Sequence, residues 1–195
     1  SDLVRESSVP TCWVRPCNAP IAAAPRNVAA PGIATVGKAT AKEIGSQASY
    51  IHLDIQNEKD WEQAIAYIQK DNKHLDILIN NASAINLTRT DQTPAKRFDL
   101  MFDVNVRGTF LTSQAALPHL RKSASEGRNP HILNLSPPLS MKPIWFKNHV
   151  AYTMAKYGMS MCVLGMAEEF KRDGIGVNAL WPRTVIDTAA LQMIP

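Results

Sequence analysis

Apolar and polar positions alternate in a regular way only in the part of the chain from residue 43 onward. Short apolar runs typical of buried strands are separated there by longer stretches whose apolar residues recur at helical spacing. The expected strands are 50–55, 75–79, 131–135 and 175–180. The expected helices are 58–70, 94–119 and 150–172. This alternation predicts an α/β fold with a parallel sheet covered by helices on both faces.

Local sequence signals predict where one of these helices begins and where another ends. Thr93 followed by Pro94 is typical of a helix start, with the threonine as N-cap and the proline at the first helical position. Gly174 follows the last expected helix, where glycine is favoured because it adopts the left-handed conformation easily.

Residues 1–42 lack that alternation. Prolines recur there every few residues, at positions 10, 16, 20, 25 and 31. Because each proline fixes φ and removes a hydrogen-bond donor, we expect an irregular segment without a long helix or a central strand. The chain therefore divides into an irregular proline-rich segment of unassigned role, 1–42, and an α/β domain, 43–195.

Composition narrows the classes of function. The chain has 195 residues, of which 45% are hydrophobic, and this suffices for one globular core. No apolar run reaches about 18 residues, the length of a membrane span. The net charge of +4 is not gathered into a basic stripe, so we do not expect a nucleic-acid partner. The three cysteines form neither a disulfide framework nor a metal site. They favour a reducing compartment such as the cytoplasm, with peroxisomes and mitochondria left open.

Polar and turn-forming residues follow the expected strands. Asn80, Asn81 and Ser83 surround the end of the second strand, Ser136 directly follows the third, and Pro182 follows the fourth. Because ligands bind outside the carboxyl ends of strands in such sheets, these segments are expected to form the site.

Tyr152 and Lys156 form the most informative pair in the sequence. They lie four residues apart on an expected helix and so share a face. The ordinary pKa of tyrosine is about 10, and a neighbouring ammonium favours the phenolate. A tyrosine tuned in this way can give or take a proton at neutral pH. The same spacing also occurs in amphipathic surface pairs, so the pair by itself leaves both interpretations open.

These residues occur together in the order of a known family. The chain resembles the short-chain dehydrogenase/reductase family at Asp54, 80–83, Asn105, Ser136, Tyr152, Lys156 and 182–184. Further stretches resemble its hydroxysteroid dehydrogenase-like members, at 81–85, 136–138, 145–147, 151–160 and 180–182. The resemblance implies a Rossmann-like doubly wound sheet and a homo-oligomer. It also implies an oxidoreductase that transfers a hydride between NADP(H), with NAD as the alternative, and a carbonyl or alcohol substrate of lipid-like or steroid-like character.

The resemblance assigns catalytic roles to four residues. Tyr152 would be the general acid and base, and Lys156 would bind the nicotinamide ribose and lower the pKa of Tyr152. Asn105 would sit in a kink in the middle of a helix and hold a water for proton relay. Ser136, or else Ser140, would stand in for the family's catalytic serine, whose usual position holds a proline here.

Cofactor contacts would come from the ends of the strands. Asp54 would accept a hydrogen bond from the adenine amino group, beside the backbone of Ile55, and Asn81 and Ala82 would line the adenosine. The residues that would hold the carboxamide end of the nicotinamide are Pro182 and Val185.

Two further departures from the family pattern, besides the proline at the serine position, affect these roles. Ser83 replaces the glycine of Asn-Asn-Ala-Gly, and no glycine-rich pyrophosphate loop of the form Thr-Gly-x-x-x-Gly-x-Gly occurs in the sequence. The family's central first strand has no evident counterpart, so its place would be taken by 11–14, by 33–36, by another chain, or by nothing stable. A second hypothesis therefore stays open, namely a cofactor-impaired, non-enzymatic member that binds ligands or oligomerises.

Overall fold

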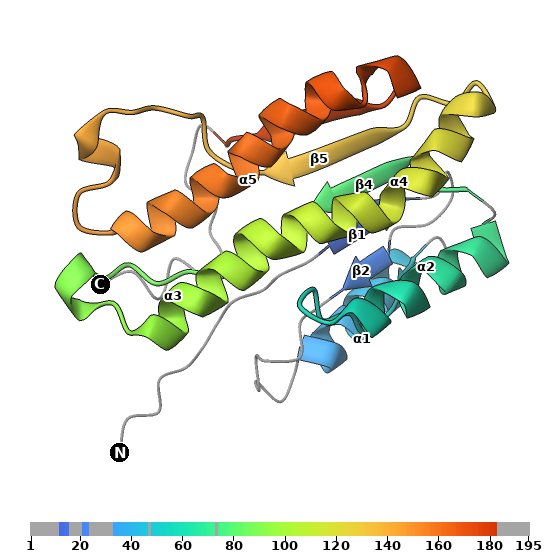
Figure 1. The fold of residues 1–195 in the computed structure, drawn as a ribbon. Coiled ribbons are helices and arrows are strands. Elements are labelled where there is room, and N and C mark those ends of the chain that lie inside the picture. The colour runs from blue at the N-terminus through green and yellow to red at the C-terminus, as the bar shows by residue number, and fades with distance from the viewer. Residues whose placement is uncertain (1–11, 16–20, 24–32, 47, 73, 183–195) are drawn as a thin grey trace.

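The computed structural model describes residues 12–15, 21–23, 33–46, 48–72 and 74–182, which form one mixed sheet with helices on both faces (Figure 1). The sheet has six strands in the order β3-β2-β1-β4-β5-β6. The strands are β1 (Cys12–Arg15), β2 (Ile21–Ala23), β3 (Ser49–Tyr50), β4 (Ile77–Asn80), β5 (His131–Leu135) and β6 (Gly176–Leu180).

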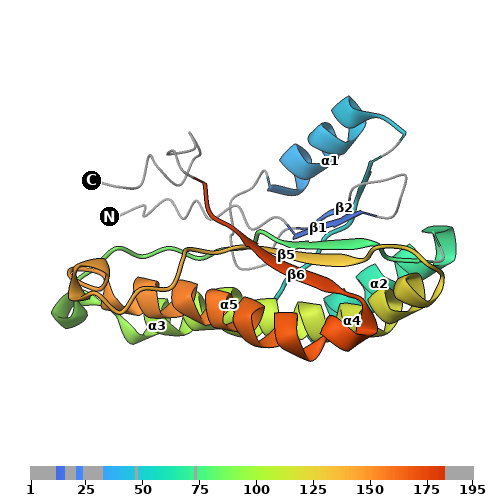
Figure 2. The ribbon, with the colours of Figure 1, turned by 90° about the horizontal axis from the view of Figure 1, so that it is seen from above.

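The α-helices cover the sheet unequally. They are α1 (Ile33–Ile44), α2 (Glu58–Asn72), α3 (Ala95–Phe102), α4 (Thr109–Ser125) and α5 (Val150–Glu169). Figure 2 shows α1 on one face of the sheet and the other four helices on the opposite face. The α/β fold with helices on both faces is thus confirmed. No helix among the described residues is both long enough and apolar enough to cross a membrane.

The expected parallel sheet is confirmed for three neighbouring strands and wrong for β1. Strands β4, β5 and β6 run parallel, with Ile77 opposite His131 and His131 opposite Gly176. Strand β1 runs antiparallel to both of its neighbours, β2 and β4. The short sequence interval between β1 and β2 accounts for this direction, because parallel neighbours need a crossover of a dozen or more residues.

Part of the proline-rich segment is more regular than expected. Strand β1 overlaps the segment 11–14 and occupies a central place in the sheet, so the expectation of no central strand is wrong. Helix α1 has 12 residues and includes 33–36, so the expectation of no long helix is also wrong, as is a strand at 33–36. The helix begins after Pro31, and the next proline in the sequence is Pro94, so no proline interrupts it.

Strand and helix boundaries differ from the expectations at two further places. The strand expected at 50–55 is reduced to Ser49–Tyr50, since the neighbouring β2 pairs with only these two residues. Helix α3 starts at Ala95 with Pro94 as its N-cap, one position later than expected. The Thr93 hydroxyl instead donates a hydrogen bond to the Arg89 carbonyl at 2.8 Å, in the turn before the helix.

Two clusters of buried apolar side chains form the core. The first cluster lies between the sheet and helices α2, α4 and α5, and its most buried members include Leu75, Leu120 and Ile132. The second cluster lies beneath the loops that follow β3 and β4. Its members are Ile55, Ala82, Ala84, Met101, Val104, Ala151 and Ala155. The second cluster holds the loop after β4 against α5.

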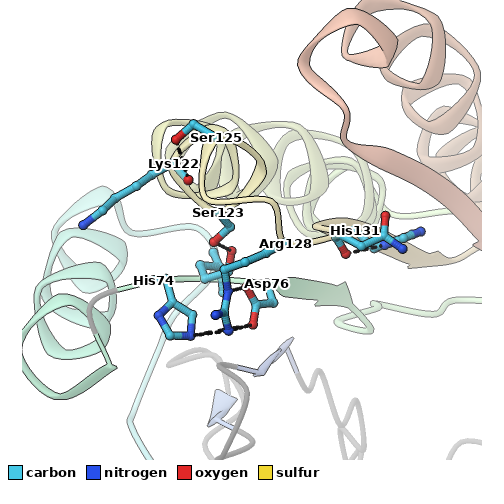
Figure 3. Close-up of polar contacts among 9 residues, drawn as sticks. His74, Asp76, Lys122, Ser123, Ser125, Arg128 and His131 are labelled. Atoms are coloured by element: carbon cyan, nitrogen blue, oxygen red, sulfur yellow. Dashed lines mark hydrogen bonds and ion pairs between the residues drawn. The ribbon is translucent and has the colours of Figure 1, made fainter.

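A polar cluster lies at the end of the sheet where strands β4 and β5 begin (Figure 3). The Arg128 guanidinium donates from Nε to Asp76 Oδ1 and from Nη2 to Asp76 Oδ2, both at 2.7 Å. His74 Nε2 lies 2.7 Å from the same guanidinium nitrogen. The Ser123 hydroxyl donates to the Leu75 carbonyl at 2.6 Å. These contacts join α4 and the connection between α4 and β5 to the residues before β4.

Candidate active site

A cavity of about 790 Å³ lies at the carboxyl ends of β5 and β6, beside the first turns of α5. Apolar side chains form most of its wall. The polar groups on the wall include the side chains of Ser136, Tyr152 and Lys156. A cavity of this size and character suits a small organic ligand oriented by a few polar groups.

Tyr152 lies near the start of α5 and is half-buried against the second core cluster. Burial raises the pKa of its phenol, and a hydrogen bond with the Ser83 side chain acts in the opposite direction. The phenol therefore keeps its proton at neutral pH, which is the form that a general acid needs. The expected lowering of this pKa by Lys156 is not found, because burial is the dominant effect on the phenol.

Lys156 lies one turn further along α5, on the same face as Tyr152. Its Nζ donates to the Leu135 carbonyl at the end of β5 at 2.8 Å, and it lies 3.3 Å from Met159 Sδ. Burial lowers the pKa of this amine to about 8. The ammonium form still predominates at neutral pH, so a positive charge lines the cavity.

Asn105 lies in a π-helical segment, Asp103–Gly108, that joins α3 to α4. This segment interrupts the regular α-helix at the place where the kink was expected. The Asn105 side chain is fully buried, at 0% exposure, and bonds both backbone groups of Ala84. A π-turn inside an α-helix is often found at functional sites. Here it turns the amide toward the loop after β4. The water-holding role of Asn105 stays a prediction.

Ser136 directly follows β5 and is buried on the wall of the cavity. Its hydroxyl has no hydrogen-bond partner among the described residues. A buried hydroxyl without a partner is costly, so it suits a site where a ligand supplies the partner. Ser140 also lines the cavity, and its hydroxyl accepts the Lys142 N–H at 3.4 Å.

The residues expected to hold the adenosine lie apart from this cavity. The Asp54 carboxylate is buried and accepts the Gln56 N–H at 3.0 Å, while Ile55 belongs to the second core cluster. Asn81 is half-buried and Ala82 is buried in the loop after β4. At the other end of the site, Pro182 lines the cavity, whereas Val185 lies outside the described residues.

A buried polar network behind the cavity was not anticipated from the sequence. The Asn80 amide donates to Asn134 Oδ1 at 2.8 Å and to the Ser113 hydroxyl at 3.0 Å. The Thr112 hydroxyl donates to Asn80 Oδ1 at 2.9 Å. The network joins β4, β5 and α4. The only signal for this network in the sequence was the presence of polar residues at strand positions that are usually apolar.

The residues present fit the nicotinamide end of a dinucleotide cofactor. The cavity offers an unpaired buried hydroxyl at Ser136 and donor groups at Tyr152 and Lys156, as a ribose and carboxamide require. For the pyrophosphate, the sequence has no glycine-rich loop. The chemistry of the described residues therefore suits the nicotinamide end of such a cofactor.

The comparisons with known proteins agree on the family and the fold. A family model described as short chain dehydrogenase matches residues 21–194. Hydroxysteroid dehydrogenase-like protein 2 of Danio rerio is 56% identical over 164 residues, which make up 84% of this chain and 38% of that protein. Its counterpart in Homo sapiens is 54% identical over 151 residues, 77% of this chain and 35% of that protein. The chain thus spans less than two-fifths of the length of these relatives.

Solved structures show the same fold. A short chain dehydrogenase from Mycobacterium thermoresistibile has a TM-score of 0.70 and 47% identity, over 78% of this chain and 54% of that one. A putative dehydrogenase from Xanthomonas campestris has a TM-score of 0.75 and 44% identity, over 90% of this chain and 64% of that one. The family match begins at residue 21, so the similarity includes part of the proline-rich segment 1–42.

Proposed function

Because this chain belongs to the short-chain dehydrogenase family, we propose that it transfers a hydride between NADP(H) and a carbonyl or alcohol substrate, with Tyr152 as general acid and base. The observation that carries this proposal is the joint presence of Tyr152, Lys156 and the unpaired Ser136 hydroxyl on one cavity wall. A 3-ketoacyl-(acyl-carrier-protein) reductase from Brucella melitensis, 26% identical with a TM-score of 0.68, was solved in complex with NADH, which supports a nicotinamide cofactor.

The nicotinamide, when bound, supplies or accepts the hydride. Tyr152 gives its phenolic proton to the substrate oxygen during reduction, and its phenolate takes that proton back during oxidation. The Lys156 ammonium stabilises the phenolate and offers N–H groups to the ribose. The Ser136 hydroxyl donates to the substrate oxygen and stabilises the charge that develops there.

The cavity wall favours an apolar substrate. Ile85 and Leu87 approach from the loop after β4, and Trp145 and Trp181 from the loops after β5 and β6. With few polar groups beside this apolar surface, the site suits a lipid-like or steroid-like molecule that carries one carbonyl or alcohol group.

We also propose that the chain forms homo-oligomers through α4 and α5. Large apolar side chains are exposed along these two helices, and they are Phe110, Met154, Met161 and Leu164. Such exposure on one helix layer is typical of a protein interface. Light scattering of Leu164→Glu should show a smaller species, whereas Ile144→Glu, at an exposed apolar residue elsewhere, should leave the mass unchanged.

The free thiol of Cys162 on α5 fits the cytoplasmic compartment proposed from the cysteine content.

The experiment that tests the main proposal is an NADPH titration followed by energy transfer from tryptophan, since Trp145 and Trp181 line the cavity. Saturable binding, followed by turnover that Tyr152→Phe abolishes while folding and binding persist, supports the oxidoreductase. A parallel titration with NADH decides the cofactor preference. A folded chain that binds neither nucleotide would contradict the proposal and favour the non-enzymatic ligand-binding module.

A further inference from the structure

His149 lies on the wall of the cavity, three residues before Tyr152, and has no part in the reaction proposed above. It is half-buried and forms the N-cap of α5. Residues three apart along a helix are neighbours on its surface. A ligand that reaches Tyr152 in this cavity therefore also passes close to His149.

The chain before α5 fixes the place of His149. Asn148 has φ 73°, a left-handed conformation that asparagine adopts more readily than most residues. The His149 N–H donates to the Phe146 carbonyl at 3.2 Å, and the His149 carbonyl accepts the Thr153 N–H at 3.0 Å. The Phe146 ring packs edge-on against Tyr157 of α5, with 5.3 Å between the ring centres. The backbone of His149 is thus bound on both sides.

Thr153 determines which nitrogen of the His149 ring carries a proton. Thr153 is 7% exposed, and its hydroxyl donates to the Trp145 carbonyl at 2.7 Å. Because a hydroxyl has a single proton, it must accept in its contact with His149 Nδ1, which lies at 3.0 Å. Nδ1 is therefore protonated. In the neutral ring, Nε2 then has a lone pair and acts as an acceptor.

Nε2 is the ring nitrogen that remains for a ligand. No described residue forms a hydrogen bond with it, and the ring belongs to the wall of the cavity. In the proposed reduction, the Tyr152 phenol and the Ser136 hydroxyl both donate to the substrate oxygen. An acceptor such as Nε2 does not bind a carbonyl oxygen. It binds an O–H or an N–H group instead.

We infer that His149 is a specificity-determining residue: its Nε2 accepts a hydrogen bond from a donor group that the substrate carries besides the group that reacts. The donor is a hydroxyl or an amide N–H, since both offer the same chemistry to Nε2. This inference rests on the proposed function for the choice of the reacting group, and it adds one donor to the apolar substrate class given there.

The apolar surroundings make this contact selective. Most of the cavity wall is apolar, so a bound ligand without a donor would leave Nε2 facing carbon atoms. A site that holds a polar group for a hydrogen bond discriminates against the analogue that lacks the partner, because that polar group then stays unpaired.

The tautomer can be tested without any ligand. The five histidines of the chain would be labelled with ¹⁵N, and the His149 signals identified by their loss in His149→Gln. Two-bond proton–nitrogen spectra at about pH 9, where an imidazole is neutral, should show the proton on Nδ1. Thr153→Val removes the acceptor and should abolish this preference, whereas Thr153→Ser should keep it. A proton on Nε2 in the native chain would overturn the inference.

The donor can be tested by binding, followed through the fluorescence of the tryptophans on the cavity wall. The probes are 2-decanone, 4-hydroxy-2-decanone and N-hexyl acetoacetamide, which have no donor, a hydroxyl and an amide N–H. One of the two donor probes should bind about tenfold more tightly than 2-decanone, as one hydrogen bond allows, and the better one identifies the donor. His149→Phe should reduce this ratio to about one, and His149→Gln, which keeps an acceptor, should preserve part of it.

The outcomes separate this inference from the proposed function. Equal binding of the three probes, no binding of any of them, or a ratio that His149→Phe leaves unchanged would overturn the role of His149. None of these measurements needs turnover. If Tyr152→Phe kept full activity, the proposed chemistry would fail instead, while the tautomer and the binding ratio would still support the donor site.

Discussion

Asn105 and Ala84 bind each other through two hydrogen bonds, one in each direction, at 2.8 and 2.9 Å. The pair joins the π-helical segment between α3 and α4 to the loop after β4. This loop carries Ile85 and Leu87, which line the same cavity as Tyr152. The order of the site therefore depends on one buried amide on a neighbouring helix.

Asn105→Ala should destabilise the chain by about 3 kcal/mol, because two buried backbone groups lose their partner. Asn105→Asp should be at least as harmful at pH 7, since a carboxylate would then face the Ala84 carbonyl. Part of that loss should be recovered at acidic pH, where the carboxyl regains a proton to donate. Equilibrium urea unfolding measures each change. A loss below about 0.5 kcal/mol in both variants would show that the pair does not hold the loop.

Two glycines on α5 should respond in opposite ways to the same substitution. A Cβ atom at Gly158 would lie 2.6 Å from Val106 Cγ2, whereas nothing lies within 4 Å of a Cβ at Gly165. Gly158→Ala should therefore lower stability by about 1–3 kcal/mol through overpacking. Gly165→Ala should raise it by about 0.5–1 kcal/mol, because alanine favours the helix. Thermal unfolding of both, with Val106→Ala as the rescue of Gly158→Ala, checks the contact.

Lys156 should make stability rise with pH in the alkaline range. Burial lowers the pKa of this amine from 10.5 to about 8, so the folded state carries an unfavourable charge below pH 8. Between these two values the unfolded chain binds more protons than the folded one. The penalty is therefore relieved as the pH rises through this window, by about 3 kcal/mol in total.

Replacement of the amine isolates this effect. Urea unfolding between pH 7 and pH 10 should show a gain in the native chain relative to Lys156→Met. Other titrating groups contribute equally to both proteins and cancel in the difference. A difference that stays constant over the whole range would contradict the buried charge.

The Asp76–Arg128 pair should stabilise the fold far more than the similar Arg121–Asp173 pair. The Asp76 carboxylate is 10% exposed and Arg128 29%, whereas Arg121 and Asp173 are 52% and 31% exposed. Removal of a partner from a mostly buried pair costs about 3 kcal/mol, and from an exposed pair about 1 kcal/mol or less. Arg128→Ala and Arg121→Ala provide the matched comparison, with chemical denaturation as the measurement. Equal losses would refute the structural role of the cluster in Figure 3.

The sequence was sufficient to predict the elements that rely on local patterns. Strand β5 alternates half-buried and buried residues and was predicted at 131–135, where it lies. Helix α2 was also predicted, since Trp61, Ala64 and Ile68 recur at helical spacing and are all buried. Elements that depend on pairing with a distant segment of the chain were not predicted. The direction of β1 and the shortening of β3 follow from strand pairing, which leaves no signature in the paired segments themselves.

The same distinction holds for the site. Tyr152, Lys156 and Ser136 line one cavity, and sequence order with the position of strand ends anticipated their proximity. The π-helical segment around Asn105 follows the resemblance to the family rather than any local pattern. The close packing of the loop after β4 against α5 could not be foreseen, because it depends on how closely four alanines from distant segments approach one another.

The π-helical segment also constrains how this region can change over evolution. Each residue of a regular α-helix turns the side-chain direction by about 100°, and a π-turn accommodates one extra residue. Met101 before the segment and Leu120 after it both face the interior, because the π-turn absorbs the rotation that the extra residue would otherwise cause. Loss of one residue of the segment other than Asn105 would restore a regular helix and keep both faces toward the core, whereas a residue lost from the regular turns of α3 or α4 would rotate the rest of that helix by about 100°. A lineage of such proteins should therefore tolerate a deletion within this segment more readily than a deletion in the regular turns on either side.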